Sequence, residues 1–320
     1  MRALLVVNPT ATTTRPRTRE VLVSALSAEL DLEIVETTHR GHAIELGTRA
    51  ARESYDVVVA LGGDGTVNEV VNGLLVDGPR ADLPSLGVVP GGSANVFIRA
   101  LGAPRDPVDA TGLLLEALRE GRRRTIGLGR VNDRWFIFCA GYGLDAAVVS
   151  RVESARSTGR TATPGLYVRS AVAQYLTGPE RQAANVELKI DPPDAALGRT
   201  ADRETSEPNG RFAAVIVQNC SPWTYLGARP VNPCPDASFE TGLDLLALRA
   251  WRLPSTLRTV WQILSPRPDP HGRQILRRHD LSGFVLRTDT PLAAQVDGDY
   301  LGELTEMRFS GVPDALRVVV

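Results

Sequence analysis

A glycine-rich segment near residue 60 has the residue types that bind phosphate groups. Gly62-Gly63-Asp64-Gly65-Thr66 follows an apolar run, and apolar residues at helical spacing come directly after it. Glycines just before a helix let backbone N–H groups converge on one anion, and the helix dipole favours negative charge there. Thr66 and Glu69 have the Thr-x-x-Glu spacing of a capping box, which predicts that the helix starts at Thr66. The segment therefore predicts a polyphosphate-binding loop, whereas glycines alone would also suit a plain turn.

A carboxylate inside this loop indicates the kind of phosphate chemistry. Asp64 would repel a bare phosphate, so its presence makes sense if it meets Mg²⁺ or accepts a proton from a hydroxyl group. The phosphate loop that requires a Gly-Lys-Ser/Thr sequence is excluded, because the chain has a single lysine, Lys189, which follows a leucine.

Further polar and glycine-rich loops follow other predicted strands. Pro90–Asn95 comes after an apolar run, and its Ser93 could cap the next helix or bond a phosphate oxygen. Asn8-Pro9-Thr10 and Thr37-Thr38 also follow apolar runs. Loops at the carboxyl ends of parallel strands line the ligand crevice of a doubly wound sheet, so we expect these segments to lie at one edge.

The first third of the chain alternates predicted strands with predicted helices. Such alternation predicts a parallel sheet with helices on both faces. The predicted strands are 3–7, 32–35, 56–61 and 85–89, and the predicted helices are about 17–30 and 42–52.

From about residue 126 the pattern changes to strands without regular helices between them. This predicts a largely antiparallel β domain, with a hairpin around Asn132-Asp133. The predicted strands are 129–131, 135–139, 186–190, 212–218, 243–248, 284–287, 293–296 and 316–320. We also predict a helical stretch over about 145–176 and an exposed loop over 191–210.

The composition fits a globular protein of two modest domains. The 320 residues are 43% hydrophobic and 23% charged, and the net charge of -1 gives no argument for nucleic-acid binding. Three cysteines in a chain of this length fit a reducing compartment better than a disulfide framework. No apolar run has the length to span a bilayer, so we expect a cytoplasmic protein that at most rests on the inner face of the membrane.

Two groups of side chains allow either a structural interpretation or a role in lipid binding. We expect Trp223, Tyr225, Trp251 and Trp261 to lie in the core, the alternative being a groove for acyl chains. We expect the basic segment 265–280 to form solvated loops, the alternative being contact with anionic lipid head groups.

Taken together, these motifs resemble the diacylglycerol kinase catalytic family, which includes sphingosine kinases and bacterial lipid kinases. The Gly62–Leu74 run is the most specific match. The matching stretches are Asn8-Pro9-Thr10, Thr37 with Gly41-His42-Ala43, Gly62–Leu74, Pro90–Asn95 with Arg99, Gly141–Asp145 and Val296–Asp299.

The resemblance implies an α/β fold with a doubly wound nucleotide domain and a β-sandwich-like domain, with the active site between them. It assigns ATP binding to residues 1–126, with a return of the chain at about 306–320, and lipid binding to 127–305. The residues carried over as contacts of ATP are Asn8, Pro9, Thr10, Thr12, Thr37, Gly62, Gly63, Asp64, Gly65, Thr66, Asn68, Glu69, Gly92, Ser93 and Asn95.

The implied reaction is transfer of a phosphoryl group from ATP to a hydroxyl of diacylglycerol or a related lipid. Asp299 stands where the family has its proposed catalytic Glu, so it is our first candidate for the base, with Asp64 second. Asp64 and Asp297 are the predicted contacts of Mg²⁺. Asp297-Gly298 also reads as a hairpin turn, and a turn can present a carboxylate.

Two other functions remain open from the sequence. NAD kinase shares the Gly-Gly-Asp-Gly-Thr element, so the acceptor could be a soluble molecule. The second alternative is a non-catalytic protein that binds nucleotide or lipid. It stays open because Asp299 replaces the Glu that the family has at this position. The identity of the lipid and the presence of a homodimer also stay open.

Overall fold

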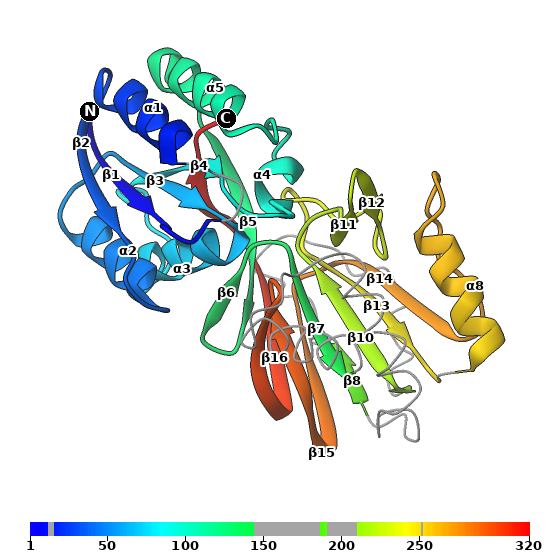
Figure 1. The fold of residues 1–320 in the computed structure, drawn as a ribbon. Coiled ribbons are helices and arrows are strands. Elements are labelled where there is room, and N and C mark those ends of the chain that lie inside the picture. The colour runs from blue at the N-terminus through cyan, green and yellow to red at the C-terminus, as the bar shows by residue number, and fades with distance from the viewer. Residues whose placement is uncertain (12–15, 144–185, 191–209, 251) are drawn as a thin grey trace. The chain divides into compact units, whose positions relative to one another are not determined.

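The computed structural model separates into two compact units (Figure 1). It describes residues 1–11, 16–143, 186–190, 210–250 and 252–320. The first unit comprises Met1–Leu128 and Pro313–Val320, and the second comprises Gly129–Val312. The helix predicted over 145–176, the loop predicted over 191–210 and Trp251 lie outside the described residues, apart from Gly210.

The first unit is built on a parallel sheet, as the sequence predicts. Its strands are β1 (Arg2–Val7), β2 (Asp31–Glu36), β3 (Val57–Gly62), β4 (Ser85–Pro90) and the end of β16 (Asp299–Val318), in the order β2-β1-β3-β4-β16. Every residue of β3 and β4 is buried, which explains their continuous apolar sequences. Val318 lies beside Leu86, so the last strand brings the chain end back to this sheet.

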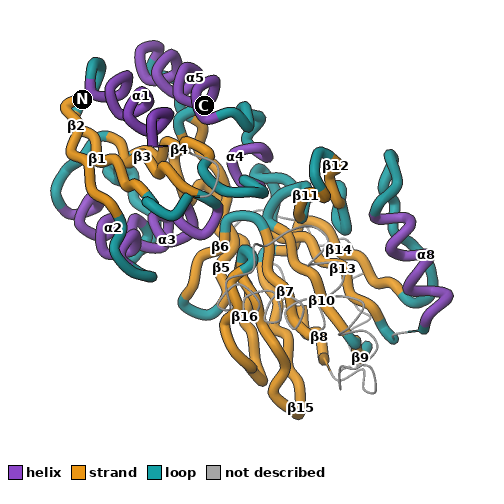
Figure 2. Tube along the Cα trace, in the orientation of Figure 1, coloured by secondary structure: helices purple, strands orange, loops and turns teal. Residues whose placement is uncertain are grey.

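Helices cover both faces of this sheet, as Figure 2 shows with the helices in purple. They are α1 (Pro16–Ser27), α2 (His42–Arg52), α3 (Asp64–Leu74), α4 (Val96–Ala100) and α5 (Pro107–Glu120). Leu26 of α1 and Leu114 of α5 share a core with Leu5 of β1. The helix α5 is absent from our predictions, although its signals are present: Asp106 caps its start and Gly121 ends it in the left-handed conformation.

Two glycines bring α2 and α3 into close contact. A Cβ atom on Gly73 would lie 2.2 Å from the carbonyl oxygen of Ile44 and 2.8 Å from the amide nitrogen of Thr48. A Cβ on Gly47 would lie 2.5 Å from the carbonyl oxygen of Val70. Neither helix has room for a larger residue at these positions, so α3 is held against α2 at a fixed distance.

Replacing Gly73 with alanine is therefore expected to destabilise the first unit by about 3 kcal/mol, because two backbones must separate. Urea unfolding of the full chain measures this change. Gly112 in α5 is the matched control, since a Cβ there meets nothing within 4 Å. Gly112→Ala should stabilise the protein by up to about 1 kcal/mol. Equal stability of Gly73→Ala and the unchanged protein would contradict the close packing.

The second unit is rich in strands, and its pairings are antiparallel. Besides the rest of β16 it contains β5 (Arg124–Val131), which begins in the first unit, β6 (Arg134–Phe136), β7 (Cys139–Gly143), β8 (Val186–Ile190), β9 (Arg211–Phe212), β10 (Ala214–Gln218), β11 (Thr224–Leu226), β12 (Arg229–Val231), β13 (Leu243–Leu248), β14 (Ile275–Leu281) and β15 (Gly283–Val296). Phe136, Phe284 and Phe309 lie in its core. The predicted fold class, an α/β domain followed by a strand-rich domain, is confirmed.

Three details of the second unit differ from the predictions. The runs 284–287 and 293–296 belong to one strand, β15. Residues 275–281, predicted as part of a solvated loop, form strand β14 beside β13. A helix that the sequence reading missed, α8 (Leu253–Ile263), precedes β14.

Among the described helices, none combines the length and the apolar character needed to cross a bilayer.

Candidate functional site

The predicted loops lie at one edge of the parallel sheet in the first unit. Val7, Glu36 and Leu61 are register partners at the carboxyl ends of β1, β2 and β3, and Gly62 pairs with Pro90 at the end of β4. The strand order reverses between β1 and β3, where a doubly wound sheet opens its ligand crevice. The loop after β1 and the first glycine loop flank this point.

The two glycine loops pack backbone against backbone. The N–H of Gly91 donates to the carbonyl oxygen of Gly62 at 2.7 Å. A Cβ on Gly92 would lie 2.7 Å from the Cα of Gly63, and a Cβ on Gly63 would lie 3.2 Å from the Cα of Gly92. Side chains at these positions would push the loops apart, so the glycines are needed for the approach. The two loops therefore form a single surface of backbone groups.

The helix α3 begins earlier than the sequence predicts. Its N-cap is Gly63, and the first helical hydrogen bond runs from the N–H of Val67 to the carbonyl oxygen of Gly63 at 3.1 Å. The amides of Asp64, Gly65 and Thr66 precede this ladder, and no side chain in the described part of the chain caps the helix. These uncapped N–H groups, at the positive end of the helix dipole, are suited to an anion.

The predicted capping box of Thr66 and Glu69 is wrong, because both side chains bind elsewhere. The hydroxyl of Thr66 accepts a hydrogen bond from Asn8 Nδ2 at 3.0 Å. The carboxylate of Glu69 accepts from the N–H groups of Gly41 and Ala43 at 3.0 and 3.3 Å, so it caps α2 instead of its own helix. Both contacts tie α3 to the loops after β1 and β2.

Asp64 connects the two glycine loops. Its Oδ2 and Oδ1 atoms accept the N–H groups of Val96 and Phe97 at 2.9 and 3.0 Å, which are the first amides of α4. Burial of the carboxyl group raises the pKa of Asp64, while the two backbone N–H groups and Arg99 act in the opposite direction. Asp64 thus has a structural task, and its parts in magnesium binding and proton transfer stay predictions.

The second loop is held by Asn95, and Ser93 does not cap the helix that follows. Asn95 is left-handed with φ 48°, and its side chain accepts from the N–H of Gly92 and donates to the carbonyl oxygen of Gly92. Capping of α4 falls to Asp64, so Ser93 is left exposed at the tip of the loop. Of the two roles that the sequence left open for Ser93, contact with a phosphate oxygen is the one that remains.

The other predicted nucleotide contacts differ in how far their side chains are exposed to solvent. Asn8 accepts from both the amide and the hydroxyl of Thr10, and Pro9 and Thr10 are exposed. Thr37 donates its N–H to the carbonyl oxygen of Val7, which holds it at the end of β2. Asn68 is 1% exposed inside α3, so its side chain is covered by protein. Thr12 lies outside the described residues.

Asp297 and Asp299 belong to the second unit, where Asp297 lies in the β15–β16 turn and Asp299 directly follows it. Asp297 and Gly298 have φ of 49° and 84°, so the hairpin reading of this sequence is confirmed. The buried carboxylate of Asp297 accepts the N–H groups of Ile137, Phe138 and Cys139 at 2.7 to 3.0 Å. These bonds make Asp297 an anchor for the start of β7, and its predicted contact with Mg²⁺ stays untested.

Asp299, at the start of β16, is held by Arg134, at the start of β6. Its Oδ2 accepts from an Nη atom of Arg134 at 3.1 Å, and both side chains keep partial exposure, 25% for Asp299 and 30% for Arg134. A partly exposed carboxylate fixed by an ion pair can still meet a substrate hydroxyl. The described residues contain no cluster of three or more His, Cys, Asp or Glu that could hold a metal by itself.

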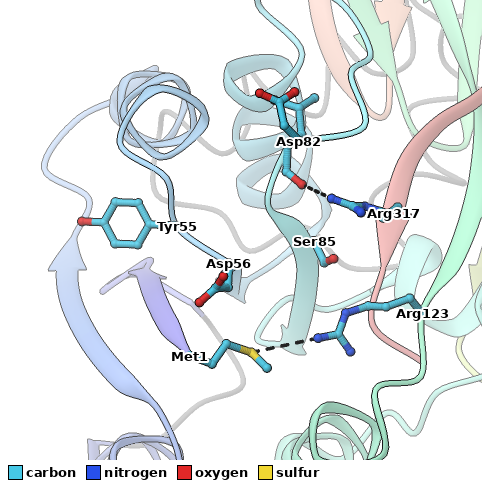
Figure 3. Close-up of a pocket in the computed structure, with 8 residues that line it drawn as sticks. Met1, Tyr55, Asp56, Asp82, Ser85, Arg123 and Arg317 are labelled. Atoms are coloured by element: carbon cyan, nitrogen blue, oxygen red, sulfur yellow. Dashed lines mark hydrogen bonds between the residues drawn. The ribbon is translucent and has the colours of Figure 1, made fainter.

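A cavity of about 430 Å³ lies at the opposite edge of the parallel sheet (Figure 3). Met1, Asp56 and Ser85 line it at the amino-terminal ends of β1, β3 and β4, and the side chains of Arg123 and Arg317 extend toward it from the other side. The glycine loops lie at the carboxyl ends of the same strands. This cavity is therefore separate from the candidate site.

Fold and site together define a two-unit α/β protein with paired glycine loops at the carboxyl edge of a doubly wound sheet. Residues 2–131 match the family model of the diacylglycerol kinase catalytic domain. The diacylglycerol kinase of Bacillus subtilis strain 168 is 33% identical over 314 residues, which cover 95% of this chain and 91% of that protein. The chain therefore belongs to the diacylglycerol kinase family, which supports a lipid kinase role.

A second curated relative and a solved structure are also similar to this chain. The diacylglycerol kinase of Staphylococcus aureus strain MRSA252 is 36% identical over 144 residues, which is 44% of each chain. A crystal structure of a diacylglycerol kinase from Bacillus anthracis strain Sterne has a TM-score of 0.70 at 20% identity, and covers 99% of this chain and 96% of that one. At this identity the structural likeness supports the fold alone.

Some residues that shape the site lie in stretches that match the family, but no role in the site was predicted for them. Gly91 approaches Ala11 and Gly62, and the amides of Gly41 and Ala43 donate to the carboxylate of Glu69. Gly91 could have been predicted from the sequence, because it is a glycine directly before Gly92, a predicted contact of ATP. The partners of Glu69 lie 26 and 28 residues away in sequence, and no local pattern identifies them.

Proposed function

We propose that this protein transfers the γ-phosphoryl group of ATP to a hydroxyl of diacylglycerol or a closely related lipid. The observation that carries the proposal is the set of uncapped amides at the start of α3, beside a second glycine loop packed against it. Family membership supports a lipid hydroxyl as the acceptor. We expect the reaction to occur in the cytoplasm, at the membrane that holds the lipid.

In the proposed mechanism, backbone N–H groups of residues 63–66 and the loop around Ser93 bind the polyphosphate. The lipid oxygen attacks the γ-phosphorus, the bond from that phosphorus to the bridging oxygen breaks, and ADP leaves. Asp299 accepts the proton of the lipid hydroxyl as the new bond forms. Most of the rate enhancement would come from positioning and charge neutralisation.

Magnesium would neutralise charge on the phosphate oxygens when bound. Mg²⁺ keeps several waters and usually needs only one or two protein carboxylates, so the lack of a larger acidic cluster in the described residues is compatible with it. Asp64 is the better candidate for the contact, because it lies in the glycine loop and each of its two carboxylate oxygens accepts a single backbone N–H group, which leaves lone pairs for a metal. We do not retain Asp297 for this role, because three backbone donors occupy its buried carboxylate.

The test is a transfer assay with the purified chain, labelled ATP and three acceptors in parallel: dispersed diacylglycerol, a sphingoid base and NAD. We expect label in a phosphatidate-like product and none in NADP. Transfer to NAD alone would replace the proposal with a soluble-substrate kinase. Nucleotide binding without transfer to any lipid alcohol would indicate a non-catalytic family member.

A further inference from the structure

Helix α8 (Leu253–Ile263) presents its apolar residues to solvent and its polar residues to the protein. Leu253, Leu257, Val260 and Trp261 are 53%, 60%, 45% and 72% exposed. Thr259 and Gln262 on the other side are 4% and 5% exposed. This arrangement is the reverse of an ordinary surface helix, and it corrects our expectation that Trp261 lies in the core.

Polar contacts within the second unit fix this orientation. Gln262 accepts the N–H of His271 at 3.3 Å through Oε1, and its Nε2 lies 3.3 Å from the His271 ring. The N–H of Asn232 donates to the carbonyl oxygen of Ile263 at 3.4 Å. Turning the apolar side inward would break these bonds, so polar contacts with the rest of the second unit hold the apolar face outward.

The exposed apolar residues form one continuous stripe. Leu253, Leu257, Val260 and Trp261 have the spacing i, i+4, i+7 and i+8, which puts them on one face of a helix. Other exposed apolar residues, such as Val21 in α1 and Val108 in α5, do not share a helix with a second one. Single exposed apolar residues are ordinary, whereas a stripe ending in tryptophan marks a contact surface.

The charges around α8 indicate what covers the stripe. Arg252, Arg258, Arg267 and Arg273 are exposed, and Asp269 is the one acidic residue between positions 252 and 273. Arg277 already pairs with Asp269 at 2.9 Å. The region is therefore positively charged in a chain whose net charge is -1. An apolar face with Trp and flanking Arg is typical of a helix that lies in the interface of an anionic bilayer.

We propose that α8 docks on an anionic lipid bilayer, with Leu257, Val260 and Trp261 inserted at the boundary of head groups and acyl chains. The inference rests on the proposed function, because diacylglycerol is held in a bilayer and the enzyme must reach it there. A second copy of the chain fits less well. A symmetric contact through α8 would gather the arginines of both copies around one interface, and α8 carries no acidic residue to pair with them.

Vesicle sedimentation with the full-length chain tests the proposal without any need for kinase activity. The vesicles are phosphatidylcholine alone, or phosphatidylcholine with about 30 mole per cent phosphatidylglycerol. The double variant Leu257→Glu, Trp261→Glu should partition at least about tenfold more weakly onto the anionic vesicles. Val21→Glu is the matched control, since Val21 and Leu257 are both 60% exposed, and it should bind like the unchanged protein.

A second variant separates charge from insertion. Arg252→Gln with Arg267→Gln should weaken binding to the anionic vesicles about fivefold per arginine and leave the weak binding to neutral vesicles unchanged. The Leu257→Glu, Trp261→Glu variant should phosphorylate detergent-dispersed diacylglycerol at the normal rate and vesicle-held diacylglycerol more slowly. A chain with no kinase activity that still binds vesicles through α8 would defeat the proposed function and leave this inference standing.

Three results would overturn the docking proposal. One is full vesicle binding by the Leu257→Glu, Trp261→Glu variant. Another is an equal loss of binding in Val21→Glu. The third is a dimer of the unchanged chain in sedimentation equilibrium that this double variant dissociates while neither protein binds vesicles, since that result assigns α8 to a second copy.

Discussion

Replacing Asp299 with asparagine should lower kcat for lipid phosphorylation by about 10² to 10⁴-fold, the range expected when a general base is removed. The KM for ATP should stay within about twofold, because the proposed contacts of ATP belong to the glycine loops. The fold should survive, since a partly exposed ion pair such as Asp299–Arg134 contributes at most about 1 kcal/mol. Steady-state kinetics at varied ATP and lipid concentrations measure both constants.

Two controls sharpen the Asp299 experiment. Asp133→Asn removes a fully exposed carboxylate from the neighbouring β5–β6 turn and should leave kcat unchanged. Arg134→Gln removes the ion pair but keeps the carboxylate, so its loss of kcat should be smaller than that of Asp299→Asn. A normal kcat in Asp299→Asn would remove Asp299 as the base and move the role to Asp64.

Gly92→Ala should weaken ATP binding by at least about tenfold, because the added Cβ would lie 2.7 Å from the Cα of Gly63. Neither backbone can yield without moving the other loop, so the amides at the start of α3 and the second loop would no longer face one anion. The same strain should cost about 1 to 3 kcal/mol of stability. Titration calorimetry with ATP and magnesium measures the affinity, and urea unfolding measures the stability.

Gly112→Ala again serves as the control, and its ATP affinity should equal that of the unchanged protein. Unchanged affinity in a folded Gly92→Ala protein would show that the close packing of the two loops does not matter for the nucleotide. Loss of stability with full affinity would give the glycine pair a purely structural role.

The sequence was sufficient to predict the parallel sheet and to place the glycine loops at the carboxyl ends of its strands. The run Val57–Leu61 is continuously apolar because β3 is buried on both faces, and an uninterrupted apolar run of this length is typical of such a strand. Period and turn signals also predicted the antiparallel character of the second half. Such features depend on residues close together in the chain, which is why they are readable without a structure.

The contacts inside the site were not predictable in the same way. Thr66 and Glu69 match a capping box, yet each has its partner far away in sequence, in Asn8 and in the start of α2. Asp64 looked like a free carboxylate, and its contacts with α4 come from residues 32 and 33 positions further on. Long-range hydrogen bonds therefore decide which polar residues of the loop are structural.

Helix α8 escaped prediction for a different reason. Its apolar residues have a helical period, but we predicted no element for residues 253–263 and interpreted only the basic segment 265–280 as loops. The sequence pattern cannot tell which side of an amphipathic helix faces the protein. Only the burial of Thr259 and Gln262 shows that the apolar side faces outward.

The most direct measurement of the central claim is a crystal structure of the full chain with ATP and magnesium. We predict that polyphosphate oxygens lie within hydrogen-bond distance of the N–H groups of Asp64, Gly65 and Thr66, with Ser93 alongside. A nucleotide bound elsewhere, or a glycine surface closed off by other side chains while ATP is turned over, would contradict the account.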